Sequence, residues 1–181
     1  MKVALVIGHT KTKDKGAFSN QLRQTEFDYN LQVAEALKAI NPSMFDIYTH
    51  EIQDYYQRQK GMAYKLNQKT YDLVIEMHFN SASVTANGTE TLYYFNSKKG
   101  KEYAEILSKK ISEDFGTKLR GVNGAKALVN KNDRGYWFVY LPKAPAVMLE
   151  PFFGSNPAEA EKFKDVSKYA RSIYNAILKF K

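Results

Sequence analysis

The sequence predicts a single α/β domain, residues 1–181, with a mainly parallel central sheet flanked by helices. Short apolar runs alternate along the chain with longer segments whose apolar residues recur at helical spacing. This alternation is typical of parallel strands joined by helical crossovers. No repeat, low-complexity stretch or linker rich in Pro, Ser and Gly divides the chain, and 181 residues suffice for one domain with its own core.

The first half of the chain is expected to alternate between strands and helices. Residues 3–7 form a short apolar run, which predicts a buried strand. Residues 26–40 place apolar side chains on one helical face, and the pair Asn41-Pro42 ends that helix because proline cannot continue it. In order, we expect a strand at residues 2–8, a helix at 26–40, a strand at 45–49, a polar helix at 54–68 and a strand at 72–80.

The second half is expected to continue the pattern. The pair Asn87-Gly88 is a turn signal that introduces the next strand. Residues 98–115 carry apolar side chains at helical spacing, and so do residues 157–179. In order, we expect a strand at 89–95, a helix at 98–115, short strands at 127–129 and 136–140, a buried strand at 146–151 and one last helix at 157–179.

The composition restricts the classes of function. The chain has no cysteine, which excludes a disulfide framework, a thiolate nucleophile and a cysteine zinc site. Its net charge of +8 favours anionic partners, although a solvated lysine-rich surface explains the charge equally well. No apolar run approaches the ~18 residues of a membrane span. The first apolar run is also too short for a secretory signal peptide, so none is expected.

Common catalytic motifs are missing from the sequence. It has no G-x-S-x-G nucleophile elbow, no phosphate-binding loop and no dinucleotide-binding fingerprint. His50 and Glu51 begin a near match to the zincin motif H-E-x-x-H, but Asp54 replaces the second histidine. We attribute that near match to chance.

The other two histidines have positions that suggest a metal site. His9 directly follows the first predicted strand, and His78 lies near the end of the strand at residues 72–80. Both strand ends should open at the same edge of a parallel sheet, where active sites gather. Imidazole is a common metal ligand, so the shared placement favours a pair of ligands over two separate structural histidines.

Several glutamates could complete such a site. Glu26 lies on the inward face of its predicted helix, where a carboxylate needs a partner, either a metal or the helix dipole. Glu150 ends an apolar run and should also lie at the carboxyl end of a strand. Glu76 shares a sheet face with His78, and Glu90 follows the turn at the start of its strand. The pattern alone does not choose among Glu76, Glu90 and Glu150 as a catalytic base.

Two histidines and one carboxylate form a three-ligand zinc site with an open position for water. Zinc would activate that water and polarise a scissile carbonyl, and a further glutamate could pass the water proton to a leaving amine. The residues therefore predict a zinc hydrolase that acts on an amide or ester, without naming the substrate.

Four blocks of the chain carry recognisable motifs. V-I-G-H at 6–9 leads to D-K-G-A at 14–17, D-L-V-I-E-M-H-F-N stands at 72–80, and N-G-T-E-T-L-Y-Y at 87–94. The segment at 145–159 reads P-A-V-M-L-E-P-F-F-G-S-N-P-A-E and is the most specific. In this order the blocks resemble the zinc-dependent N-acetylmuramoyl-L-alanine amidases of the Amidase_3 family. That family's blocks read G-H, D-x-G-A, D-L-x-I-S-I-H-A-N, G-x-E-x-Y-Y and P-A-V-L-V-E-x-G-F-x-S-N-P-x-E.

The resemblance implies a role for each site residue. His9, Glu26 and His78 would bind Zn²⁺, and Glu150 would be the catalytic carboxylate. The reaction implied is hydrolysis of the amide between N-acetylmuramic acid and L-alanine in bacterial peptidoglycan. The glycines that often follow the first histidine are replaced at residues 10–13 by Thr-Lys-Thr-Lys, which puts the substrate preference in doubt.

Further residues are candidates for supporting or substrate-binding roles. Asn80 would orient groups near the metal, and Glu90 would be structural or would support the residues that bind the metal. Glu76 stands where the family usually has a small residue, so it is a candidate partner of His78 behind the metal. Arg134 and Trp137 are candidate residues of the substrate groove.

Other functions compete with this interpretation. A related zinc hydrolase could cut another amide, such as a poly-glutamyl chain, and a non-catalytic wall-binding module would have a dead metal site. A nucleic-acid binder would rest on the charge alone, since the basic residues are spread along the chain and no motif is present. We expect a monomer that binds no nucleic acid. It would be made in the cytoplasm and act on the wall after release, as a phage endolysin does, or be a trimmed domain of a secreted protein.

Overall fold

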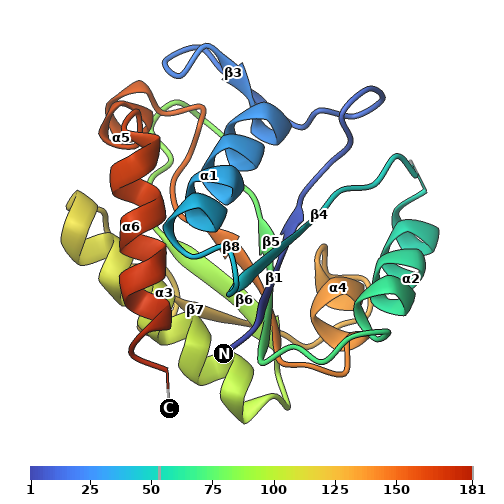
Figure 1. The fold of residues 1–181 in the computed structure, drawn as a ribbon. Coiled ribbons are helices and arrows are strands. Elements are labelled where there is room, and N and C mark those ends of the chain that lie inside the picture. The colour runs from blue at the N-terminus through green and yellow to red at the C-terminus, as the bar shows by residue number, and fades with distance from the viewer. Residues whose placement is uncertain (53, 181) are drawn as a thin grey trace.

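The computed structural model describes residues 1–52 and 54–180 and shows a six-stranded sheet between two layers of helices (Figure 1). The order of the strands across the sheet is β4-β1-β5-β8-β6-β7. A separate two-stranded sheet, β2-β3, precedes the first helix. The strands are β1 (Val3–Ile7), β2 (Phe18–Ser19), β3 (Gln24–Thr25), β4 (Phe45–Tyr48), β5 (Leu73–Met77), β6 (Glu90–Tyr94), β7 (Ala125–Leu128) and β8 (Ala146–Glu150).

The strand directions bring several strand ends to one edge of the sheet. Strands β4, β1, β5 and β8 pair in parallel, whereas β6 pairs antiparallel with β8 and parallel with β7. The register places Ile7 beside Met77, Met77 beside Leu149, and Glu90 beside Glu150. The residues that follow β1 and β5 therefore lie next to the end of β8 and the start of β6.

Helices cover both faces of the sheet (Figure 1). Alternate residues of β1 enter different cores: Leu5 packs in the cluster that contains Leu37, and Val6 packs in the cluster that contains Met62. Because both faces are covered, β1 is a continuous apolar run, which is typical of a parallel strand. The larger core lies under α1 (Glu26–Ile40), α3 (Lys98–Phe115), α5 (Pro157–Lys162) and α6 (Val166–Ile177), and the smaller under α2 (Tyr55–Leu66) and α4 (Tyr136–Tyr140).

The predicted fold class is confirmed, but two predicted elements are wrong. Residues 136–140 form helix α4 and not a strand. Gly135, with φ of 97°, precedes the first residue of this helix, and Phe138 of the helix is buried. The last helix is not continuous, because α5 ends at Lys162 and the Asp165 side chain caps a new helix by accepting the Lys168 N–H. That capping aspartate was a visible helix-start signal in the sequence.

Within residues 1–52 and 54–180, none of the helices combines the length and the apolar composition that a bilayer crossing requires.

Candidate active site

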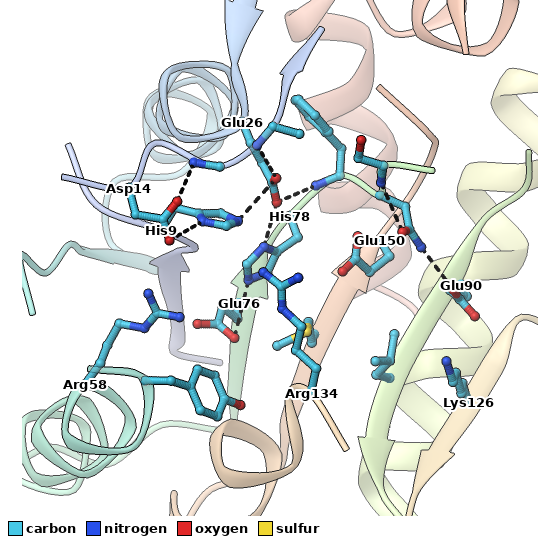
Figure 2. Close-up of a pocket in the computed structure, with 18 residues that line it drawn as sticks. His9, Asp14, Glu26, Arg58, Glu76, His78, Glu90, Lys126, Arg134 and Glu150 are labelled. Carbon is cyan, nitrogen blue, oxygen red and sulfur yellow. Dashed lines mark hydrogen bonds and ion pairs between the residues drawn. The ribbon is translucent and has the colours of Figure 1, made fainter. Parts of the chain in front are cut away.

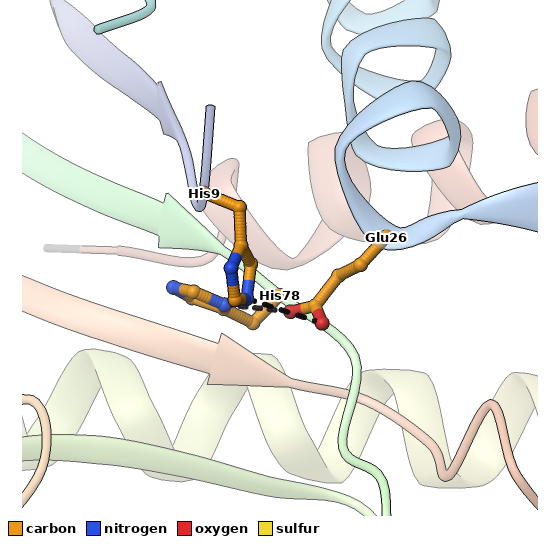
Figure 3. A group of neighbouring side chains, drawn as sticks. All are labelled: His9, Glu26 and His78. Atoms are coloured by element: carbon orange, nitrogen blue, oxygen red, sulfur yellow. Dashed lines mark hydrogen bonds and ion pairs between the residues drawn. The ribbon is translucent and has the colours of Figure 1, made fainter. Parts of the chain in front are cut away.

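A group of buried side chains lies where β1 and β5 end (Figure 3). His9 follows β1, His78 follows β5, and Glu26 is the first residue of α1. Each offers one ligand atom, and these atoms all lie within 4.8 Å of one another. The structure thus brings together the two histidines expected at strand ends and the glutamate expected on the inward face of its helix, and the group could hold a metal ion.

The Glu26 carboxylate lies between the two imidazole rings. Its Oε1 is 2.7 Å from Nδ1 of His78, and its Oε2 is 3.3 Å from Nε2 of His9. The backbone N–H groups of Phe79 and Ala17 donate to the same two oxygens at 3.2 and 3.3 Å. Burial would raise the pKa of Glu26, but the hydrogen bonds with His78 and His9 outweigh burial and lower this pKa to about 2. Glu26 is therefore an anion at neutral pH, which is the form that binds metals.

A carboxylate faces the far nitrogen of each histidine. Oδ2 of Asp14 lies 3.2 Å from Nδ1 of His9, and Oε2 of Glu76 lies 3.5 Å from Nε2 of His78. Glu76 is 1% exposed, and its other oxygen accepts a hydrogen bond from the Gln59 amide at 3.5 Å. A carboxylate behind an imidazole holds the proton on the far nitrogen and leaves the near nitrogen free as a ligand.

Glycines make room for the two histidine rings. A Cβ atom on Gly8 would lie 2.2 Å from the His78 ring. Gly16 has φ of +75°, and a Cβ there would lie 2.6 Å from Cδ2 of His9. Neither distance is compatible with a side chain, so the glycines of the G-H and D-x-G-A motifs are needed to leave space for the histidine rings.

The loop after His9 is a turn built on Thr10. The buried Thr10 hydroxyl accepts the N–H groups of Lys13 and Asp14 at 3.0 and 2.6 Å, and its own N–H donates to the Asp14 carbonyl at 2.6 Å. This turn carries the chain back so that Asp14 faces His9. The residues that replace the family's glycines therefore place a carboxylate against His9.

Glu150 ends β8 and lines the same cavity as the His9–Glu26–His78 group (Figure 2). Its Oε2 is shielded from solvent and has no hydrogen-bond partner among the described residues. Burial raises the pKa of Glu150 to about 8. The two carboxyl groups of the site thus differ: Glu26 is a bonded anion, and Glu150 is free to take up and release a proton near neutral pH.

The cavity has a volume of about 420 Å³. Asn80 and Glu90 lie in its wall, where the Asn80 amide donates to Glu90 at 3.1 Å. Arg134 also lines the cavity, whereas the Trp137 ring packs against Tyr56 at 5.0 Å and is absent from the wall. Side chains to which the sequence assigned no role at the site also line the cavity; they include Asp14, Arg58 and Lys126.

Of those side chains, only Asp14 had a sequence signal, since it opens the D-x-G-A motif. Arg58 lies on the polar helix α2 and Lys126 on the edge strand β7. No motif marks either residue, and their approach to the site follows from tertiary packing.

An α/β sheet with a buried His-Glu-His group at its strand ends, and a protonatable glutamate beside it, defines a candidate hydrolase site. Residues 3–179 match the Amidase_3 family model, which is described as N-acetylmuramoyl-L-alanine amidase. The chain belongs to this family, so the resemblance seen in the sequence and the enzyme class that it implied are confirmed.

Two curated proteins of Bacillus subtilis (strain 168) are similar to the chain. The N-acetylmuramoyl-L-alanine amidase LytC is 26% identical over 176 residues, which cover 93% of this chain and 33% of LytC. The uncharacterized protein YqiI is 23% identical over 174 residues, which cover 92% of this chain and 76% of YqiI. The chain thus spans about a third of the length of LytC.

Solved structures of catalytic domains are similar over the whole fold. The catalytic domain of the CD27L endolysin, which targets Clostridia difficile, has a TM-score of 0.79 and 26% identity, covering 98% of this chain and 97% of that one. The catalytic domain of CwlV, an N-acetylmuramoyl-L-alanine amidase of Bacillus (Paenibacillus) polymyxa, has a TM-score of 0.76 and 25% identity, covering 100% of both chains.

Proposed function

We propose that this protein hydrolyses the amide bond between N-acetylmuramic acid and L-alanine in bacterial peptidoglycan, with Zn²⁺ held by His9, Glu26 and His78. The observation that carries the proposal is the metal-binding group with the unbonded carboxyl of Glu150 in one cavity. The family membership supplies the substrate.

The donor set fits zinc. Two imidazole nitrogens and one carboxylate are a ligand set of catalytic zinc sites, which keep a further position open. The group is buried, Glu26 is ionised, and each far imidazole nitrogen faces a carboxylate. When bound, zinc would supply a Lewis acid beside the scissile carbonyl.

The protein's own residues account for the proton transfers. The Glu150 carboxylate, which lines the cavity, accepts a proton from the attacking water and then donates that proton to the leaving amine of alanine. Burial raises its pKa to about 8 in the metal-free protein, and a nearby zinc ion would lower that pKa toward neutral pH, where a carboxyl group gains and loses a proton readily. Asp14 and Glu76 keep the histidines in the orientation that leaves their near nitrogens facing Glu26.

The test combines metal content with product analysis. Purified protein is measured for zinc per chain and assayed on purified peptidoglycan, beside Glu150→Gln and the exposed control Glu35→Gln. We expect one zinc per chain, new amino-terminal alanine and no new reducing sugar. Glu150→Gln should keep zinc and lose activity, while Glu35→Gln should keep both.

The alternatives have their own outcomes. Zinc without release of alanine would move the proposal to another amide, such as a poly-glutamyl chain. New reducing sugar would indicate glycosidic cleavage, which the site does not explain. Protein without zinc after metal supplementation would refute the ligand assignment.

The setting of the activity is also a proposal. The similarity to the CD27L catalytic domain supports a lytic enzyme that acts on the wall from outside the host membrane after release. The monomer expected from the sequence stays a prediction, which light scattering of the purified protein would check.

A further inference from the structure

One wall of the catalytic cavity carries a buried arginine without an anionic partner. Arg58 is 7% exposed and lines the cavity from α2. Its Nε is shielded from solvent and has no hydrogen-bond partner among the described residues. No described carboxylate oxygen lies within 4.0 Å of its nitrogens, and its guanidinium carbon lies 5.4 Å from the centroid of the Tyr55 ring. A buried guanidinium that lacks acceptors is costly unless a ligand provides them.

A second arginine reaches the cavity from the loop before α4. Arg134 is exposed, lines the cavity and makes no ion pair within the described part of the chain. The Gly135 N–H donates to the Tyr55 hydroxyl at 2.8 Å, which ties this loop to the helix that carries Arg58. Both guanidinium groups point from the side of α2 and α4 toward the His9–Glu26–His78 group (Figure 2).

The carboxylates already in the site interact with this pair only over distances longer than an ion pair: the charge of Arg58 lowers the pKa of Asp14 and Glu76, but none of their oxygens lies within 4.0 Å of its nitrogens. Asp14 faces His9 and accepts the Gly16 N–H at 3.1 Å, and Glu76 faces His78 and Gln59. Both acids therefore have histidines, and not the two arginines, within ion-pair distance.

Arg120, which does not line the cavity, shows what an arginine with an ion-pair partner looks like in this protein. Its Nε lies 3.2 Å from Glu90, and its guanidinium packs over the Phe153 ring at 4.9 Å. Arg58 and Arg134 have no such carboxylate, so they are available to an anionic ligand.

We propose that Arg58 and Arg134 form a carboxylate-binding subsite, so that the enzyme prefers peptides with a free carboxylate close to the scissile amide. A guanidinium matches a carboxylate through two parallel N–H donors, and a neutral carboxamide cannot replace both acceptors. One residue of extended peptide spans about 3.5 Å. A subsite beside the His9–Glu26–His78 group would therefore contact the first or second peptide residue beyond the cleaved bond. This inference rests on the proposed amidase activity.

Two synthetic substrates test the subsite. Both are N-acetylmuramoyl dipeptides that begin with L-alanine; in one the second residue carries a free carboxylate next to its α-carbon, and in the other that group is a carboxamide. We expect kcat/KM to be about 10- to 100-fold higher for the carboxylate substrate, because the carboxamide leaves a buried guanidinium unpaired. The measurement is made with the zinc-loaded enzyme.

Variants assign the preference to the two arginines. Arg58→Gln and Arg134→Gln should bring the ratio of the two kcat/KM values toward one, through slower cleavage of the carboxylate substrate alone. Arg171→Gln, on the exposed side of α6, is the matched control and should keep the ratio. Since Arg58 is buried and its replacement could disturb folding, exposed Arg134 and the conservative Arg58→Lys provide independent readings.

Each outcome decides one point. Equal kcat/KM on both substrates in the wild type overturns the subsite and leaves the amidase proposal intact. A preference that survives in both Arg58→Gln and Arg134→Gln also overturns it. Failure to cleave either substrate refutes the proposed amidase function and the subsite with it.

Discussion

The two sides of the catalytic cavity differ in how completely their polar groups are partnered. On the side of β1, β5 and α1, both oxygens of Glu26 have two partners each, and both histidines contact carboxylates on two sides. On the opposite side, Glu150 and Arg58 keep buried atoms that have neither a hydrogen bond nor an ion pair within the described residues. The first side therefore suits the metal site that we propose, and the second suits the proposed contacts with a substrate.

The largest effect on activity should follow from removing Glu26, on the side of the cavity formed by β1, β5 and α1. Glu26→Ala removes one ligand and leaves both near imidazole nitrogens without their shared acceptor. We expect zinc content to fall close to zero and release of alanine from peptidoglycan to cease. Glu35→Ala, at an exposed position of the same helix, is the control for helix propensity. An active, zinc-containing Glu26→Ala variant would mean that another carboxylate binds the metal.

Replacing Glu150, on the opposite side of the cavity, should lower the rate of hydrolysis without lowering zinc binding. Glu150→Gln keeps the shape of the side chain and removes its acid–base function, so kcat should fall by about 10²- to 10⁴-fold. Zinc content and substrate KM should change little. A fall in zinc content equal to the fall in activity would place Glu150 among the ligands.

The same residue should make the metal-free protein sensitive to pH. The pKa of Glu150 is about 8 in the fold and near 4.5 in the unfolded chain, so the folded state binds this proton more tightly. Its contribution to stability is therefore fully present below pH 4.5 and is lost as the pH rises toward 8. The loss over this range should be about 4 kcal/mol.

Urea unfolding of chelated protein at pH 5, 6.5 and 8 measures that loss. Glu150→Gln cannot titrate, so its unfolding free energy should fall less over the same range than that of the wild type. Parallel curves for the two proteins would contradict the raised pKa. Bound zinc should reduce the difference, because a nearby cation favours the ionised carboxylate.

An intermediate effect should come from the carboxylate behind His78. Glu76→Ser introduces the kind of small residue that the family usually has here, and it leaves Nε2 of His78 without its carboxylate at 3.5 Å. We expect zinc to bind about 10- to 100-fold more weakly, as measured by competition with a chelator. Unchanged affinity would show that Glu76 is not needed to orient His78.

The sequence could predict that several of the cavity residues meet, because strand ends can be recognised from apolar runs. His9, His78 and Glu150 each follow or end an apolar run, and parallel pairing brings such positions to one edge. Arg58 was not predictable, because its burial depends on how α2 packs near β5 and α4. The aromatic run at 136–140 has high strand propensity, yet burial of Phe138 after the left-handed Gly135 favours a helix.

Replacing Trp137 should have the smallest effect on catalysis among the variants considered. Trp137 was a candidate groove residue, but its ring packs between Tyr56 and Tyr140 at centroid distances of 5.0 and 5.9 Å and does not line the cavity. Trp137→Ala should therefore lower the free energy of unfolding by about 1 to 3 kcal/mol. It should change kcat/KM on peptidoglycan by less than about threefold, because no group of the cavity wall is removed.

Tyr55→Phe provides the comparison. It deletes the hydroxyl of a cavity-lining residue that accepts the Gly135 N–H, so it should have a larger effect on kcat/KM than Trp137→Ala and a smaller effect on stability. A tenfold loss of kcat/KM in Trp137→Ala with unchanged stability would instead extend the substrate groove over α4, because a long glycan strand would then contact aromatic side chains beyond the cavity.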